Sequence, residues 1–354
     1  MKLSELGEDA FLRELGKRFP PKGKNVVLGI GDDAAILEPP AGERLLLTTD
    51  SLVEGVHFAR RWMPPKFLGR KAVAVNASDI AAMGGEPLGV LLSLAVPPES
   101  EVESLWQVVE GADERARELG MSLMGGNLAS SPGGIFVDVT VIGATVRKRA
   151  LRRSGARPGD GVYLSGKIGA AITGLRLLEH GAVLAPGGGL IVPLRLRGGP
   201  IALAEACIRA QIDPEPRLAL GRELNRRRLA TACIDVSDGL ALDLHRLCRA
   251  SGVGARIQES ALPLSPGLLA WERVWKRDPT LSAVSGGEDY ELLFTSGSEE
   301  KLARYRERID LFLTRIGETT SEECVELVGR DGVTRPLSAS GWDHFGRATT
   351  GESL

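Results

Sequence analysis

The sequence predicts an α+β protein of two domains, and three observations carry that prediction. The chain has 354 residues, enough for about two domains. Several strand-like apolar runs adjoin without a helix between them, which favours α+β over a doubly wound parallel sheet. A basic stretch rich in Gly and Pro, residues 147–161, marks a boundary. We therefore expect one domain at residues 1–147 and a second at 148–354.

Periodicity and turn residues predict the elements in chain order. In the first domain we expect helices at 4–19, 65–83 and 99–119, and strands at 26–30, 45–50, 89–96, 121–124 and 135–146. In the second we expect helices at 169–180, 201–211, 217–229, 240–250 and 298–309, and strands at 162–164, 232–236, 254–257 and 290–294. The Gly- and Pro-rich stretch 185–200 predicts a loop.

Composition limits the possible classes of function. The chain is 43% hydrophobic and 25% charged, as ordinary globular proteins are, and its net charge of −2 indicates neither nucleic acid nor an anionic membrane as partner. The four cysteines form no close pair, which argues against a thiolate metal site or a disulfide framework. With no secretory signal and no apolar run of membrane length, we expect a cytoplasmic protein.

Acidic residues recur at the ends of the predicted strands. Asp32 and Asp33 directly follow the run 26–30, and Asp50 ends the run 45–50. The same residue type recurs beside Gly or Ser, or on a helix face near a strand end, at Asp79, Asp235, Asp238, Glu288 and Asp289. Carboxylates that converge repel one another unless they share a cation, and hard oxygen ligands select magnesium or calcium. Magnesium ions in such a cleft can bind a polyphosphate, and Thr48 and Thr49 add neutral oxygens.

Each acid also has an ordinary interpretation. Asp238 can cap the helix 240–250, and Asp79 can pair with Lys71 on a solvated helix face. Asp289 and the pair at 32–33 can be turn residues. These alternatives stay open for each acid alone, but all of them holding together is far less expected.

Two glycine-rich stretches come close to nucleotide-binding motifs. Residues 29–34 fit G-x-G-x-x-A, but the helix that must follow directly is absent from the pattern. Residues 161–167 nearly complete a P-loop, but Ile168 stands where a Ser or Thr would bind magnesium. We assign neither motif.

Seven stretches in order along the chain carry a family resemblance: GIGDDAA at 29–35, TTDSLVEGVHF at 48–58, KAVAVNASDIAAMG at 71–84, RSGARPGD at 153–160, DVSDGL at 235–240, SGGEDYEL at 285–292 and GWDHF at 341–345. They resemble thiamine-monophosphate kinase, in the superfamily of aminoimidazole ribonucleotide synthetase. The resemblance implies a ferredoxin-like N-terminal domain that pairs its sheet in a homodimer, and a C-terminal α/β-sandwich domain. It also implies direct in-line phosphorylation of thiamine monophosphate by ATP, assisted by several Mg²⁺ ions.

The resemblance also implies roles for individual residues. Magnesium would be held by Asp33, Thr48, Thr49, Asp50, Asp79, Asn127, Asp235 and Asp238, of which Asp33, Asp50, Asp79 and Asp235 are the catalytic residues. ATP would be held by Gly126, Asn127, Arg153 and Ser237, and the thiamine phosphate by His57, Glu288 and Trp342. The family usually has Gly-Gly-Asp-Thr where this chain has Gly125-Gly126-Asn127-Leu128, so one carboxylate is missing there.

Several alternatives remain open. Trp342 can be a core aromatic residue, and His57 a packed histidine. Selenophosphate synthetase would need a reactive Cys near the amino end, whereas the first here is Cys207, and the hydrogenase-maturation relative would need a terminal Cys, whereas this chain ends in Leu354. A metal-dependent phosphohydrolase and a non-catalytic nucleotide-binding regulator are the rivals from other functional classes.

Overall fold

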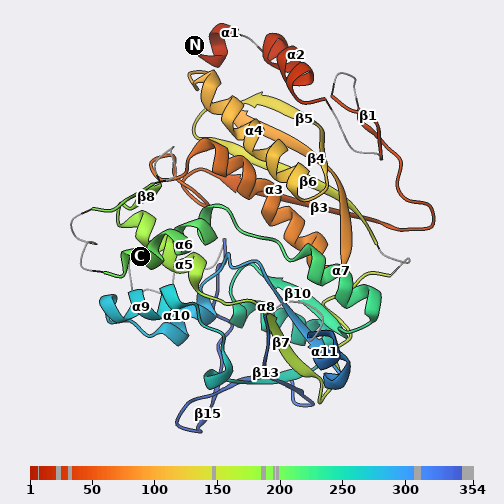
Figure 1. Cartoon of the computed structure of the whole chain (residues 1–354), viewed down its shortest axis with the longest axis vertical. Helices are drawn as coiled ribbons and strands as arrows, with labels where there is room; N and C mark the ends of the chain where they lie inside the picture. The colour runs from red at the N-terminus through yellow and green to blue at the C-terminus, as the bar shows by residue number, and fades with distance from the viewer. Residues whose placement is uncertain are drawn as a thin grey trace.

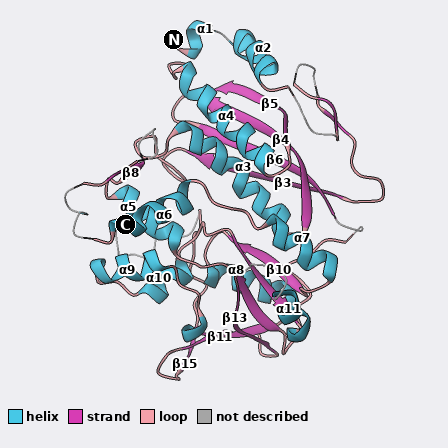
Figure 2. Ribbon diagram, viewed as in Figure 1, coloured by secondary structure: helices cyan, strands magenta, loops and turns pink. Residues whose placement is uncertain are grey.

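The computed structural model describes residues 1–6, 8–20, 25–30, 34–145, 149–184, 189–193, 196, 199–306 and 312–344. Helices and strands are mixed in both halves, as the sequence predicts, and they form an N-terminal unit and a C-terminal unit (Figures 1 and 2). The predicted boundary at 147/148 lies outside the described residues. None of the helices in the described ranges is long and apolar enough to span a membrane.

The N-terminal unit is one four-stranded sheet covered on one face by two helices. Its strands are β3 (Leu45–Val53), β4 (Gly85–Val96), β5 (Ser122–Ser130) and β6 (Phe136–Thr145), in the order β3-β6-β4-β5. Only β4 and β5 are parallel. Helices α3 (Pro65–Ala82) and α4 (Val102–Glu118) lie across one face (Figure 1). The ferredoxin-like arrangement implied by the resemblance stays a prediction.

Alternation along β3 explains why the sheet has one covered face and one open face. Leu52 is buried in the core beneath the helices, whereas Leu47, on the opposite face of the strand, is 69% exposed. The helices approach each other closely because glycine lies at the contact. A Cβ on Gly69 would lie 1.9 Å from the carbonyl oxygen of Val108, so any larger residue would force α3 and α4 apart.

The C-terminal unit is built on a seven-stranded sheet in the order β10-β12-β7-β13-β11-β14-β15. The strands are β7 (Gly161–Ser165), β10 (Ala232–Val236), β11 (Gly254–Gln258), β12 (Glu291–Ser296), β13 (Leu313–Thr320), β14 (Val325–Val328) and β15 (Thr334–Pro336). The helices are α5 (Ala170–Glu179), α6 (Ile201–Ile212), α7 (Leu218–Arg227), α8 (Leu240–Ser251), α9 (Pro266–Trp275), α10 (Pro279–Ser285) and α11 (Glu299–Arg306). Short elements complete the chain: α1 (Leu3–Leu6), α2 (Glu8–Arg18), β1 (Val26–Leu28), β2 (Ile36–Leu37), β8 (Val183–Leu184) and β9 (Leu190–Ile191).

Three differences from the predicted elements have local causes. The single helix expected at 4–19 is described as α1 and α2, on either side of residue 7. The strand expected at 121–124 continues to Ser130 because β5 pairs along β4, so Gly126 and Asn127 lie within a strand and not at its end. Helices α9 and α10 were not predicted, although Ser265-Pro266 and Asp278-Pro279 are cap-and-proline starts whose side chains accept hydrogen bonds from the first turns.

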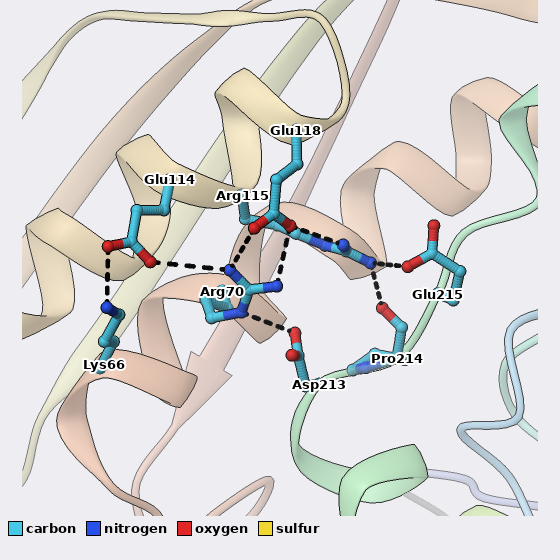
Figure 3. A network of polar contacts seen from close by, with 8 residues as sticks. All are labelled: Lys66, Arg70, Glu114, Arg115, Glu118, Asp213, Pro214 and Glu215. Atoms are coloured by element: carbon cyan, nitrogen blue, oxygen red, sulfur yellow. Dashed lines mark hydrogen bonds and ion pairs between the residues drawn. The ribbon is translucent and has the colours of Figure 1, made fainter.

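Helix α3 lies where the two units meet. At its C-terminal end, Gly221 of α7 packs so closely that a Cβ would lie 2.0 Å from the carbonyl oxygen of Ala81. Near its N-terminal end, Arg70 and Arg115 of α4 form a network with carboxylates from both units (Figure 3). The two units are therefore fixed against each other at both ends of α3.

Candidate active site

Three elements bring acidic side chains together at one end of α3. The Thr48 hydroxyl of β3 donates a hydrogen bond to Asp79 of α3. One residue earlier on α3, Ser78 donates to the carboxylate of Asp235, with 2.7 Å between the oxygens. Asp235 belongs to β10 of the C-terminal unit and is 3% exposed. Asp79 does not pair with Lys71, so the ordinary interpretation of Asp79 is wrong.

The pKa values of these acids record uncompensated negative charge. Burial, with the nearby Asp79, raises the pKa of Asp235 to about 7, and burial also raises the pKa of Asp79. Asp50 on β3 is open to solvent, yet loss of part of its hydration and repulsion from Asp79 and Asp238 raise its pKa to about 7. Within the described residues, no ion pair neutralises Asp50, Asp79 or Asp235.

A pocket of about 470 Å³ opens beside this cluster. Thr48, Asp79 and Asp235 line one part of it, and Arg153 and Ser154 line another. The Arg153 guanidinium is close enough to lower the pKa of both Asp79 and Asp235, although burial outweighs its effect. One pocket thus holds carboxylates suited to a cation and an arginine suited to an anion, the combination that a metal-bound polyphosphate needs.

The loop after β10 holds the predicted residues Ser237 and Asp238. The backbone amides of both residues donate to the buried carboxylate of Asp243, at 3.1 and 3.0 Å. Asp238 itself pairs with Arg246 at 2.5 Å. In the described structure no side chain caps α8, so the interpretation of Asp238 as its cap is wrong. Asp243 instead fixes the loop that precedes the helix. Sequence reasoning missed Asp243, although an acid in the first turn of α8 was the available signal.

Glu288 is held from both units of the molecule. Its carboxylate lies 2.6 Å from the Lys71 ammonium on α3, and the side-chain amide of Gln211 on α6 donates to its other oxygen. Lys71 and Gln211 are both fully buried. Glu288 adopts a left-handed backbone with φ of +66°, and its N–H donates to the Ser237 carbonyl at 2.7 Å. Neither Lys71 nor Gln211 was predicted to hold Glu288, because their sequence positions give no signal of this contact.

Asp289, next in the chain, has a different role. Its carboxylate accepts hydrogen bonds from the amides of Gly169 at 2.8 Å and Ala171 at 3.3 Å, where α5 begins. Burial raises its pKa to about 7, while these amides oppose that rise. Asp289 is an anchor for α5 and not a simple turn residue, so it stands apart from the acids that face the pocket.

Three rings gather near the end of β3. His57 accepts a hydrogen bond on Nδ1 from the Val53 amide at 3.0 Å, and its ring centre lies 5.1 Å from that of His344. Burial, and then the neighbouring His344, lower the pKa of His57. Trp342 meets His344 edge-on at 5.6 Å, and its backbone N–H donates to the Asp238 carbonyl. Trp342 is 44% exposed, so its interpretation as a core aromatic is wrong.

Two predicted residues lie on the open face of the N-terminal sheet. Thr49 donates to Asp138 at 3.2 Å on that face. Asn127 on β5 is in register with Ser93 on β4 and, through β4, with Asp138 on β6. Asn127 is three strands away from β3, roughly 14 Å at the usual strand spacing. A single chain therefore does not bring Asn127 together with Asp79. Asp33 and Asp32 lie outside the described residues.

The described acids suit magnesium chemically without forming a closed site. In the described part of the chain, no three His, Cys, Asp or Glu side chains are arranged to enclose a metal ion. Magnesium takes oxygen ligands, and it usually keeps waters and shares phosphate oxygens with its ligand. Repelling carboxylates with an adjacent hydroxyl are the donors that such a partial shell requires, so the residues present fit the ion.

Two protein-family models match the chain: AIR synthase related protein, N-terminal domain, at residues 31–145, and its C-terminal domain at 157–329. Thiamine-monophosphate kinase of Bacillus subtilis is 36% identical, over 91% of this chain and 94% of its own length. That of Escherichia coli K12 is 35% identical, over 96% and 98%.

Solved structures agree with these matches. Thiamine-monophosphate kinase from Stenotrophomonas maltophilia has a TM-score of 0.74 at 35% identity and covers 92% of this chain and 95% of its own. AaThiL complexed with AMPPCP and TMP has a TM-score of 0.72 at 32% identity and covers 98% and 99%. Hydrogenase maturation protein HypE, solved in complex with ATP, shares the fold, with a TM-score of 0.70 at 20% identity.

Proposed function

The chain belongs to the thiamine-monophosphate kinase family, and from that premise we propose that it phosphorylates thiamine monophosphate with ATP. An oxygen of the substrate's phosphate forms a bond to the terminal phosphorus of ATP. The bond from that phosphorus to its bridging oxygen breaks, and the bridging oxygen leaves on ADP. The observation that carries the proposal is the pocket that Arg153 shares with Asp79 and Asp235, two acids that form no ion pair within the described residues.

We assign the cation to the acids around this pocket. Thr48, Asp50, Asp79 and Asp235 would hold Mg²⁺, with Asp238, Thr49 and the family's Asp33 position as further candidates. Bound Mg²⁺ would neutralise charge on the phosphates during transfer. Asn127 lies three strands from β3, so within one chain it is separated from the acids that we assign to the cation. It stays a candidate for binding the nucleotide together with Gly126.

The chain's own residues then position two anions. Arg153 presents a planar fork of donors that matches phosphate oxygens, and Ser237, on the loop directly after β10, is the second residue that we assign to the nucleotide. A phosphate monoester is largely ionised near neutral pH, so its oxygen attacks without a strong general base. Catalysis then depends on alignment and charge stabilisation.

We assign the thiamine end of the substrate to three residues: His57, Glu288 and Trp342. The carboxylate of Glu288 provides negative charge for the cationic thiazolium ring, and Lys71 with Gln211 fixes its orientation. The exposed Trp342 ring can stack on that cation, a contact of roughly 0.5–2 kcal/mol. His57 and His344 close the same end of β3.

We also propose that a second copy of the chain covers the open face of the N-terminal sheet. Leu45 and Leu47 lie near one end of that face and Phe136 at its other end. They are 45%, 69% and 40% exposed, which is costly for large apolar side chains. Light scattering at micromolar concentration should give twice the chain mass. A fully active monomer would contradict the homodimer.

The experiment that tests the function is product analysis by chromatography after mixing thiamine monophosphate, ATP and Mg²⁺. We expect thiamine diphosphate and ADP in equal amounts. Phosphate release without thiamine diphosphate would favour a phosphohydrolase, and ATP binding without any turnover would favour a regulator. Either result would overturn the proposed kinase reaction.

A further inference from the structure

Beside the acidic pocket lies a smaller one, of about 200 Å³, in which the charged side chains are arginines. Arg44, Arg149 and Arg152 line it, together with Leu46 and Thr145. Leu46 and Arg152 also line the pocket of Thr48, Asp79 and Asp235, so the two hollows are adjacent. We call the smaller one the arginine pocket.

None of the three arginines has an acidic partner among the described residues. Within the described residues, Arg44, Arg149 and Arg152 form no ion pair, whereas Arg70 and Arg217 are paired with Glu118 and Glu291. Guanidinium groups gathered around one hollow repel one another, and a bound anion removes that repulsion. Their planar forks match the oxygens of a phosphate group.

The backbone at each arginine is anchored to a well-packed element. The Arg44 amide donates to the Thr145 hydroxyl at 3.1 Å, and the Thr145 amide donates to the Arg44 carbonyl at 2.8 Å. The Arg149 carbonyl accepts from the buried Asn225 side chain at 2.6 Å. The Arg152 carbonyl accepts from the Cys233 amide at 2.8 Å. The pocket is therefore held from β6, α7 and β10, and it is not a freely moving basic linker.

The order of groups along β3 indicates which part of a substrate the arginine pocket is placed to bind. The strand begins at Leu45 beside the arginine pocket, passes Thr48 and Asp50, and ends at Val53 beside His57. An anion in the arginine pocket and a substrate near His57 would thus lie on opposite sides of the acids. In-line phosphoryl transfer needs that arrangement of donor and acceptor.

We propose that the arginine pocket binds a phosphate group, as an anion subsite that extends the acidic pocket on the side away from Glu288. Phosphate binding follows from the arginines alone. The further identification of that phosphate as part of the nucleotide rests on the proposed function.

The test is calorimetric binding of inorganic pyrophosphate, with EDTA present so that no metal contributes. The triple variant Arg44→Gln, Arg149→Gln, Arg152→Gln is compared with the wild type and with Arg273→Gln. Arg273 is an exposed arginine on α9 without an ion pair in the described structure, so it controls for loss of charge alone. We expect the triple variant to bind at least about tenfold more weakly, and the control to bind like the wild type.

Equal pyrophosphate affinity in the wild type and the triple variant, with equal melting temperatures, would overturn the proposal. So would a loss of binding in Arg153→Gln alone with none in the triple variant. Repeating the titration with saturating AMPPCP separates two sources of phosphate, and both support the subsite. If AMPPCP displaces pyrophosphate, the subsite binds a phosphate of the nucleotide. If pyrophosphate binds together with AMPPCP, the subsite binds free phosphate. Because this assay needs no turnover, it can succeed even where the kinase reaction fails.

Discussion

Two charged regions lie on the same helix, α3, and differ in how their charges are matched. Near its start, Arg70 pairs with Glu118 at 2.8 Å and with Asp213 at 2.9 Å, while Arg115 reaches Glu215 at 2.6 Å (Figure 3). Near its end, Asp79 and Asp235 meet hydroxyl donors, and the described residues offer them no ion pair. One end is neutralised by the protein itself, and the other is left negative.

The pKa values shift in opposite directions at the two ends. Hydrogen bonding to Arg70 lowers the pKa of Glu118 to about 2, because the network favours the charged carboxylate. Burial, with repulsion from Asp79, raises the pKa of Asp235 to about 7 and outweighs the opposing effects of the Ser78 hydrogen bond and Arg153. The comparison teaches that charge by itself marks no site here. A cluster of carboxylates beside a pocket, without an ion pair in the described structure, does.

The largest expected effect comes from removing charge at the unmatched end. Asp79→Asn keeps the shape of the side chain and its contact with Thr48, but removes a negative charge from the pocket. We expect turnover to fall at least about a hundredfold, the scale of losing one transition-state charge contact. Steady-state kinetics on the folded variant measure this. The control is Asp113→Asn on α4, a half-buried acid that pairs with Arg117, and it should keep normal turnover. Near-normal turnover in Asp79→Asn would contradict its role at the cation site.

The next effect concerns Lys71 of α3, whose ammonium pairs with Glu288. Lys71→Met leaves Glu288 without its cation, so we expect the KM for thiamine monophosphate to rise about tenfold or more while the KM for ATP stays similar. Stability should fall by roughly 3–5 kcal/mol, as when a buried pair loses one partner. Steady-state kinetics measure the two KM values, and denaturant unfolding measures the stability.

A double variant separates positioning from stability. Adding Glu288→Gln to Lys71→Met removes the stranded charge, so stability should recover while thiamine-monophosphate binding stays weak. Lys71→Arg keeps the positive charge and should restore part of the affinity. Recovery of both stability and affinity in the double variant would show that Glu288 does not bind the substrate.

At the matched end, substitution should cost stability and spare activity. Arg115→Met removes a 94% buried side chain that donates to the Pro214 carbonyl and pairs with Glu215. We expect a loss of about 1–3 kcal/mol in the free energy of unfolding, with both KM values unchanged. Arg117→Met removes an exposed arginine that pairs with Asp113, and it should lower the free energy of unfolding by less than about 1 kcal/mol. A changed KM for ATP in Arg115→Met would mean that the network also shapes the site.

The smallest effect is expected at Trp342. Because Trp342 is 44% exposed and its ring meets His344 edge-on, Trp342→Ala should leave stability nearly unchanged. Loss of a cation–π contact should raise the KM for thiamine monophosphate several-fold and leave kcat and ATP binding alone. Trp342→Phe should recover part of the loss. If ATP affinity fell instead, Trp342 would not belong to the substrate end.

The sequence predicts the cluster of Thr48, Asp79 and Asp235 because strand ends, helix faces and acids are local signals. It does not predict the residues that hold Asp235, Glu288 and the loop after β10 in place. Ser78, Gln211 and Asp243 act through contacts with residues far along the chain or through a loop's shape, and no spacing rule anticipates them. Likewise β5 continues past Asn127 because β4 offers a pairing edge, which local turn residues cannot reveal.

The most direct test of the central claim is a melting curve as a function of Mg²⁺, with AMPPCP present, for wild type, Asp79→Asn and Arg115→Met. If the unmatched carboxylates form the cation site, Mg²⁺ should raise the melting temperature of the wild type and raise that of Arg115→Met by a similar amount from a lower start. Asp79→Asn should start at or above the wild-type temperature, because repulsion is relieved, and should respond little to Mg²⁺. An equal rise with Mg²⁺ in Asp79→Asn and wild type would contradict the account.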